Sequence, residues 1–196
     1  ADGIDLIPSV VFASELFWST MGKCFEQGFS KMALPESFGG LGLDPLTTGM
    51  VWEEMSRWAP GFAASLIPGG VVPQMLCFLT PNRKDLIERF VVPYCEDTTG
   101  RKITAWCSSE PDVGSDGSNY ADPKVRHQTS AVVSGDNFSL NGTKSDFVSN
   151  GSIAEHYIVF ACVEPTMGIK GSGTFLVTGD AKGLTRGKAL DKTGLR

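Results

Sequence analysis

The segment ITAWCSSEPDVGSD, residues 103–116, gathers small polar side chains around a sharp turn. Pro111 and Gly114 predict the turn, because proline fixes φ and glycine accepts backbone conformations that other residues avoid. Such a turn presents N–H groups and hydroxyls to a ligand rich in acceptors, such as a flavin ring edge or a phosphate-bearing arm. A polar surface turn with serine and aspartate caps explains the same residues, and residue chemistry alone favours that simpler interpretation. The polar side chains concerned are Ser108, Ser109, Ser115 and Asp116.

A second segment, NGTKSDFVSNG at residues 141–151, places the ring of Phe147 two residues before the hydroxyl of Ser149. In a β-strand, residues two apart point to the same side. A strand here would therefore let a ring and a hydroxyl face one planar cofactor together. The alternative is that Phe147 belongs to the core, where aromatic strand residues usually lie.

The familiar catalytic patterns do not occur in the sequence. His127 and His156 have no nucleophile at a telling spacing, so each is expected to be a surface or strand histidine. There is no G-x-S-x-G elbow, P-loop or G-x-G-x-x-G after a strand. The glycines of residues 39–44 stand between predicted helices and match no phosphate loop. The five cysteines include no C-x-x-C pair, which disfavours a zinc site and predicts free thiols in a reducing compartment.

Charge and hydropathy narrow the possible partners. The 196 residues include 17 basic and 22 acidic ones, for a net charge of −5. No basic stripe is visible, so nucleic acid is not an expected partner. No apolar run approaches the roughly 20 residues that cross a bilayer, so no membrane association is expected. The N-terminal residues lack a basic n-region, and we do not interpret them as a signal peptide.

The first half of the chain has helical spacing of its apolar residues, as in Val51, Met55 and Trp58. Thr80 is the expected N-cap of one helix, with Pro81 at its first position, and Pro93 is expected to end or kink it. Glycines and flanking prolines predict a loop over residues 35–45. The helices are expected near residues 9–29, 46–58, 63–79 and 82–92.

The second half has the pattern of β-structure. Two strands are expected within residues 130–144, joined by a tight turn at Gly135-Asp136-Asn137 and followed by a turn at Asn141-Gly142. Further strands are expected within residues 155–164 and 173–180. Short strands at close spacing suggest a small barrel or sandwich. The sequence thus predicts an α+β protein, with a helical domain at residues 1–100 and a β-domain at residues 101–196. Because the strand pattern stops without covering helices, we expect a fragment of a longer protein.

Taken together, these segments resemble the acyl-CoA dehydrogenase family. Four motifs occur in the order typical of that family: P-E-x-x-G-G-x-G, T-E-P-x-x-G-S-D, N-G-x-K-x-W-I-[TS]-N and K-x-G-x-R. In this sequence they correspond to residues 35–42, 109–116, 141–150 and 192–196.

The resemblance implies a β-domain that presents FAD. Residues from Trp106 to Ser115 would line the flavin, and Ser115 would lie near the acyl-CoA arm. The Ser149 hydroxyl would lie near flavin N5, with Phe147 at the flavin face. The implied cofactor-binding residues are Trp106, Cys107, Ser108, Ser109, Phe147, Val148 and Ser149.

The implied reaction removes the α-proton and the β-hydride of an acyl thioester to give a 2-enoyl-CoA. An electron-transfer flavoprotein would receive the electrons, and the flavin would perform the redox step. The family's catalytic base is a glutamate that would lie beyond Arg196, so no residue here is assigned as catalytic. Glu110 and Asp116 are interpreted as structural. The resemblance also implies a homo- or heterotetramer, located in the cytoplasm or, in a eukaryote, in the mitochondrial matrix.

Two departures from the family pattern leave alternatives open. Phe147 replaces the usual tryptophan and lacks its N–H donor, and Ser109 replaces the usual threonine. About ten additional residues between Asp116 and the Asn141-Gly142 turn lengthen a loop. The alternatives are a flavin-dependent monooxygenase or oxidase of the same fold, and a non-catalytic partner subunit.

Overall fold

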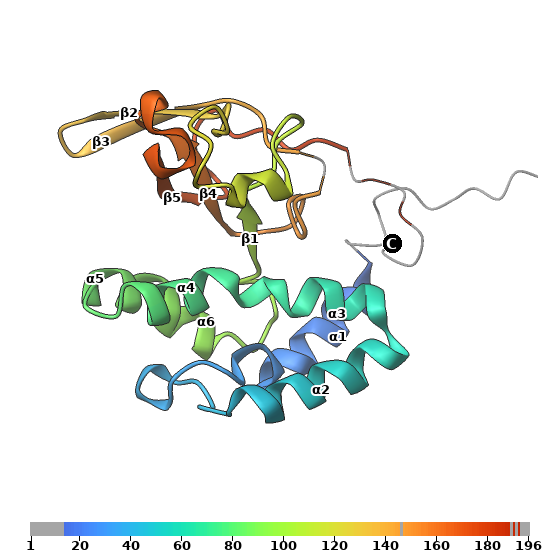
Figure 1. The fold of residues 1–196 in the computed structure, drawn as a ribbon. Coiled ribbons are helices and arrows are strands. Elements are labelled where there is room, and N and C mark those ends of the chain that lie inside the picture. Colours follow the sequence, from blue (N-terminus) through green and yellow to red (C-terminus); the bar gives the residue numbers. More distant parts are fainter. Residues whose placement is uncertain (1–13, 146, 189, 191, 193–196) are drawn as a thin grey trace, which may run out of the picture.

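The computed structural model describes residues 14–145, 147–188, 190 and 192. The helices form one layer and the strands a second layer above it (Figure 1). Strand β1 (Thr104–Cys107) rises from the helices into the strand layer and connects the two halves of the chain. A helical half followed by a strand half confirms the predicted α+β class.

The first two helices begin at side-chain caps. Helix α1 (Glu15–Glu26) starts after Ser14, whose hydroxyl accepts a 3.1 Å hydrogen bond from the N–H of Phe17. It ends before Gly28, which has a φ of 84°, so the helix stops short of the predicted residue 29, while residues 9–13 of the predicted helix lie outside the described residues. Helix α2 (Pro45–Trp58) agrees with the prediction and is capped by Asp44, which accepts from two backbone N–H groups. Residues 35–44 between these helices form the predicted loop, with one 3-10 turn at Glu36–Phe38.

The helix predicted at residues 63–79 is in fact interrupted. Helix α3 (Pro60–Leu66), a 3-10 turn (Pro68–Gly70) and helix α4 (Val71–Leu79) follow one another, because Pro68 has no N–H for the helical ladder. The Thr104 hydroxyl of β1 forms hydrogen bonds with the backbone groups that the interruption leaves without helical partners. Its hydroxyl donates to the Gly69 carbonyl over 2.8 Å and accepts from the Val72 N–H over 3.2 Å.

The same stretch corrects the expectation that no apolar run reaches membrane-spanning length. Pro60–Leu79 spans 20 residues and contains an 18-residue window with a mean hydropathy of 1.6, which by length and composition alone is enough to cross a membrane. Half of that window is buried inside the protein. Since core helices of soluble proteins have the same property, the stretch is weak evidence for a membrane span.

The helix predicted at residues 82–92 begins later and ends later. Thr80 ends α4 rather than capping the next helix, and its hydroxyl donates to the Leu76 carbonyl. Helix α5 (Lys84–Leu86), a π turn (Ile87–Val91) and helix α6 (Val92–Glu96) then form one continuous path. Of the two outcomes expected for Pro93, an end or a kink, the end does not occur, because α6 continues through Pro93 to Glu96. The π turn ends two residues before Pro93, and its wider hydrogen bonding lets the helical path continue past a residue without an N–H.

The strand layer is one open mixed sheet. Strand β4 (His156–Cys162) pairs in parallel with β1 and antiparallel with β5 (Ser172–Thr178). The hairpin of β2 (Ser130–Ser134) and β3 (Asn137–Asn141) joins β4 through Ser130 and Cys162. Its turn is Gly135-Asp136, one residue shorter than predicted. The described strands do not close into the predicted barrel or sandwich.

The main hydrophobic core lies between the two layers. Helix residues such as Leu66 and Tyr94 pack in one buried cluster with Ile103 and with Ile158 of β4. All five cysteines are free, four of them buried and Cys24 partly so, as the sequence predicted. The sheet therefore rests on the helices through a shared core.

Candidate functional site

Strand β1 delivers the chain into a tight turn at the end of the sheet. The N–H of Glu110 donates to the Val113 carbonyl over 2.8 Å, and the N–H of Gly114 donates to Asp116 Oδ1 over 2.7 Å. Asp116 is thus the loop-capping carboxylate that the sequence predicted. This turn holds the residues after β1 at the rim of the sheet.

Most of the predicted cofactor residues surround one small hollow of about 160 Å³. They come from two segments roughly 40 residues apart in sequence, and Pro68 of the helical layer completes the wall. The residues that line the hollow are Pro68, Trp106, Ser109, Phe147, Val148 and Ser149. The structure therefore brings five of the seven predicted cofactor residues together.

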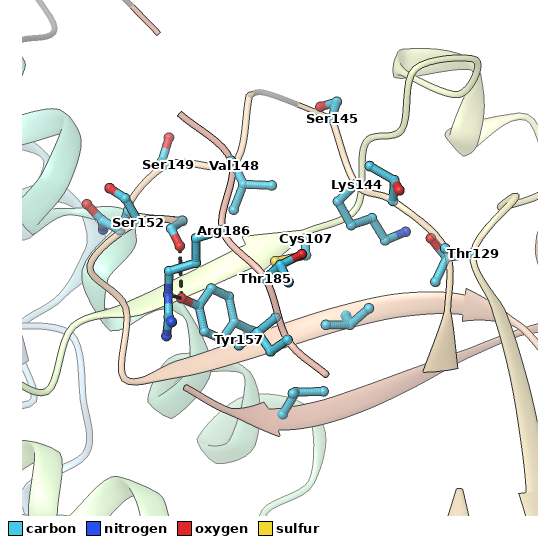
Figure 2. A pocket seen from close by; sticks show the side chains of 18 of the residues that line it. Cys107, Thr129, Lys144, Ser145, Val148, Ser149, Ser152, Tyr157, Thr185 and Arg186 are labelled. Atoms are coloured by element: carbon cyan, nitrogen blue, oxygen red, sulfur yellow. Dashed lines mark hydrogen bonds between the residues drawn. The ribbon is translucent and has the colours of Figure 1, made fainter. Parts of the chain in front are cut away.

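The alternation of β1 separates Trp106 from Cys107. The Trp106 side chain is 41% exposed and faces the small hollow, with its ring 4.8 Å from that of Phe160. Cys107 points to the other side, into a larger pocket (Figure 2). Burial raises the pKa of Cys107 to about 11, opposed by the charge of Lys144, so the thiol stays protonated at neutral pH. Cys107 is a wall residue and lies outside the small hollow.

Two predicted residues lie in neither cavity. Ser108 is half-buried, and its carbonyl accepts a 3.2 Å hydrogen bond from Lys144 Nζ. Ser115 begins an exposed 3-10 turn, Ser115–Ser118, directly after the tight turn of residues 110–114, which we call the signature turn. The structure thus gives Ser108 a backbone contact and leaves Ser115 open to solvent.

The strand predicted around Phe147 and Ser149 is wrong. The chain from Gly142 to Glu155 is loop and turn in its described residues, and the N–H of Gly151 donates to the Val148 carbonyl. Both side chains still line the hollow, because the turn carries them there. Neither the Ser149 hydroxyl nor the Ser109 hydroxyl has a hydrogen-bond partner among the described residues, so both are available to a ligand.

Sequence reasoning assigned no role to Asn150, which anchors this turn. It is buried and has a φ of 62°, a left-handed conformation that asparagine tolerates better than most residues. Its Nδ2 donates to the Ser65 carbonyl over 2.8 Å and to the Thr104 carbonyl over 3.4 Å. The asparagine at the end of the third motif was the available signal.

The larger pocket, of about 790 Å³, shares Val148 and Ser149 of the turn with the small hollow and is also lined by Cys107 of β1 (Figure 2). Arg186 Nε donates to the Tyr157 hydroxyl over 2.8 Å, and that hydroxyl donates to the Gly151 carbonyl over 2.8 Å. Burial raises the pKa of Tyr157, with Arg186 opposing the shift. Among the described residues that line it, five are basic and none is acidic; the basic ones are Lys144, Lys182, Arg186, Lys188 and Lys192.

Glu110 of the signature turn is a buried structural anchor, as the sequence predicted. Its carboxylate accepts hydrogen bonds from the backbone N–H groups of Gln128 and Thr129 and a 2.6 Å bond from Lys144 Nζ. Although burial opposes ionisation, these bonds, the one from Lys144 foremost, hold the pKa of Glu110 below its ordinary value. The ionised Glu110 side chain therefore links its own turn to the segment of Gln128 and Thr129 and to that of Lys144.

His127 corrects the expectation of a surface or strand histidine. It lies in the loop before β2, is 5% exposed, and has its Nδ1 4.0 Å from Glu110 Oε1 with no hydrogen-bond partner in the described structure. Burial and the charge of Lys144 lower the pKa of His127, against the opposing effect of Glu110. The ring is therefore neutral at physiological pH. His156 begins β4, as a strand histidine should.

The residues of the small hollow fit one edge of a flavin. Trp106 and Phe147 offer ring surfaces for a planar group, and the free hydroxyls of Ser109 and Ser149 offer donors for ring oxygen and nitrogen atoms. Among the described residues there is no group of three or more histidine, cysteine or acidic side chains that could hold a metal ion.

Comparison with known proteins identifies the family that shares these two domains. The family model for the acyl-CoA dehydrogenase N-terminal domain matches residues 10–86, and that for the middle domain matches residues 105–196. Mitochondrial short-chain specific acyl-CoA dehydrogenase of Bos taurus is 35% identical over 176 residues, covering 89% of this chain and 39% of the relative.

Solved structures agree in fold. Butyryl-CoA dehydrogenase from Megasphaera elsdenii matches with a TM-score of 0.69 and 28% identity, covering 84% of this chain and 41% of that one. A structure described as an FAD-dependent dehydrogenase matches with a TM-score of 0.66 and 27% identity, covering 84% of this chain and 42% of that one.

These matches define a class of proteins built from a helical domain followed by a mixed sheet, a fold shared with solved dehydrogenases. Within that class, the chain belongs to the acyl-CoA dehydrogenase family. It spans about two fifths of the length of the curated relatives that it matches.

Proposed function

We propose that the protein binds FAD and converts an acyl-CoA thioester into a 2-enoyl-CoA. One observation carries the proposal: two segments far apart in sequence bring Trp106, Ser109, Phe147 and Ser149 around a single small hollow. Rings and free hydroxyls at one cavity suit a planar cofactor with acceptors on its edge. Membership of the acyl-CoA dehydrogenase family supports the same cofactor.

Each residue then has a defined task. The Ser109 hydroxyl would donate to the carbonyl edge of the flavin, Trp106 and Phe147 would pack against its ring system, and the Ser149 hydroxyl would donate near N5. Val148 lines the hollow beside them and packs against the buried cluster that includes Cys107. Cys107 and Ser108 act through the backbone and the wall behind the hollow. When bound, FAD supplies the acceptor for the two electrons and the β-hydrogen that the thioester loses.

The substrate and protein partners extend beyond the hollow. Ser115, exposed after the signature turn, is the proposed contact of the acyl-CoA arm. No described residue is assigned as the base that removes the α-proton. We further propose an electron-transfer flavoprotein as the electron acceptor, a tetrameric assembly, and a location in the cytoplasm or the mitochondrial matrix.

The test uses the full-length protein. The protein is expected to purify yellow, or to become yellow when FAD is added. Its visible flavin absorbance should be lost when a saturated acyl-CoA is added without oxygen. An electron-transfer flavoprotein should then restore that absorbance faster than oxygen does.

Other outcomes separate the alternatives. Rapid reoxidation by oxygen with a hydroxylated or peroxide product would identify a monooxygenase or oxidase. A colourless protein that takes up no FAD would identify a non-catalytic subunit and overturn the proposal.

A further inference from the structure

Two hydrogen bonds join the segments on either side of the hollow, one from a side chain and one from a backbone N–H. The Ser108 carbonyl accepts from Lys144 Nζ over 3.2 Å, and the next carbonyl, that of Ser109, accepts from the N–H of Ser145 over 2.9 Å. Two consecutive residues of one segment thus hold two consecutive carbonyls of the other. This contact fixes the peptide from which the Ser109 side chain enters the hollow.

The ammonium of Lys144 is itself held in place. It is 12% exposed and lies 2.6 Å from Oε1 of Glu110, whose side chain is fully buried. Glu110 is fixed in turn by the N–H groups of Gln128 and Thr129. A buried cation with a fixed partner has little freedom, so the Ser108 carbonyl meets a donor whose position is set independently.

The Lys144 side chain lines the larger pocket and not the small hollow. Lys144 lines the larger pocket together with Cys107 (Figure 2), whereas Trp106, the neighbour of Cys107 in β1, lines the small hollow. It therefore does not touch a ligand in the small hollow, and any effect on such a ligand passes through the Ser108–Ser109 backbone.

We propose that Lys144 is a positioning residue for the flavin site, holding the Ser108–Ser109 peptide in the geometry in which it meets the flavin edge. This inference rests on the proposed function for its ligand. The fixing of the peptide itself is a property of the protein without ligand and can be measured separately.

A matched control is available in the same chain. Lys102 pairs with Glu155 over 3.2 Å, but both side chains are more than one third exposed and neither contacts Ser108 or Ser109. Lys102→Met and Lys144→Met therefore each remove one lysine–glutamate pair. Only Lys144→Met also removes the hydrogen bond to the Ser108 carbonyl.

The experiment compares the full-length wild type with these variants and Lys144→Arg. Hydrogen–deuterium exchange of the peptide around residues 104–113 is measured without ligand, and the FAD dissociation constant and visible flavin spectrum are measured with it. Lys144→Met is expected to raise exchange in that peptide at least tenfold, weaken FAD binding at least tenfold and shift the flavin bands. Lys144→Arg should recover part of each effect, and Lys102→Met should change each less than twofold.

The outcomes separate the two proposals. Unchanged exchange in folded Lys144→Met, or equal changes in Lys102→Met, overturns the positioning role. If the wild type takes up no FAD while Lys144→Met still loosens the peptide, the positioning stands and the proposed function fails. Should Lys144→Met not fold, Lys144→Gln makes the same comparison, because its shorter amide satisfies Glu110 without spanning both acceptors.

Discussion

The side-chain amide of Asn150 donates a 2.8 Å hydrogen bond to the backbone carbonyl of Ser65, a residue 85 positions earlier in the chain. Ser65 lies in α3, and Asn150 lies in the turn that carries Phe147 and Ser149. The turn of the candidate site is therefore attached to the helical layer as well as to the sheet.

Substitution of Asn150 should separate its hydrogen bonds from its backbone conformation. Asn150→Gly loses the bonds but tolerates the φ of 62°, and should cost about 1–2 kcal/mol of unfolding free energy. Asn150→Ala should cost about 1 kcal/mol more, because alanine is strained at that φ. Urea unfolding of both variants measures the difference. Equal losses would show that the backbone conformation contributes nothing.

Ser149→Ala should slow reduction of bound flavin by acyl-CoA more than it weakens FAD binding. The loss of one positioned donor at a reacting atom typically costs about tenfold to a thousandfold in rate. Stopped-flow reduction and FAD titration give the two quantities. Ser152→Ala is the control, since this exposed serine of the same turn lines only the larger pocket. Equal effects on rate and binding, or none, would contradict the N5 assignment.

Glu110→Gln should change how stability depends on pH. The folded pKa of Glu110 is lowered, so its stabilising effect is present above the ordinary carboxyl pKa of about 4.3 and is lost as pH falls through the lower folded value. The variant leaves the Lys144 cation buried without its partner, and should be about 3–5 kcal/mol less stable at pH 7. Urea unfolding between pH 7 and the acid limit should show the gap between the two proteins narrowing below about pH 4. A constant gap would exclude ionisation of Glu110 as the cause.

Two glycines of the helical half should respond in opposite directions. A Cβ at Gly40 would lie 2.0 Å from the Leu34 carbonyl oxygen, so Gly40→Ala must displace the backbone of the 35–42 loop and lower the melting temperature. Gly49 lies exposed in α2 with nothing within 4 Å of an added Cβ, and Gly49→Ala should stabilise by about 0.5–1 kcal/mol. Calorimetry of the two single variants tests both signs. A neutral Gly40→Ala would show that the loop adjusts freely.

Local sequence signals predicted those features that depend on neighbouring residues. Asp44 and Pro45 mark the start of α2, and the alternating residues after Thr129 mark the hairpin. The same signals indicated an end or a kink at Pro93, but not the π turn of Ile87–Val91 after which the helical path continues to Glu96.

The sequence suggested several residues of the candidate site, but not the long-range hydrogen bonds that hold them in place. The family resemblance suggested Trp106, Ser109 and Phe147, and these residues meet at one hollow. The bond of Lys144 to Ser108 spans 36 positions, and no local pattern encodes a contact of that range. The strand predicted around Phe147 was wrong for the same reason, because Asn150 bonds to Ser65 and imposes a turn.

The hydroxyl of Thr104, inserted between the Gly69 carbonyl and the Val72 N–H, limits how the chain can be divided. A gene fragment that stops near residue 100 would encode the helices without Thr104. The Val72 N–H and the Gly69 carbonyl would then lose their hydrogen-bond partner in an apolar setting. The sheet unit on its own would lose the floor against which Ile103 and Ile158 pack. Recombination between relatives should therefore succeed at crossover points that inherit β1 and the α3–α4 interruption from the same parent.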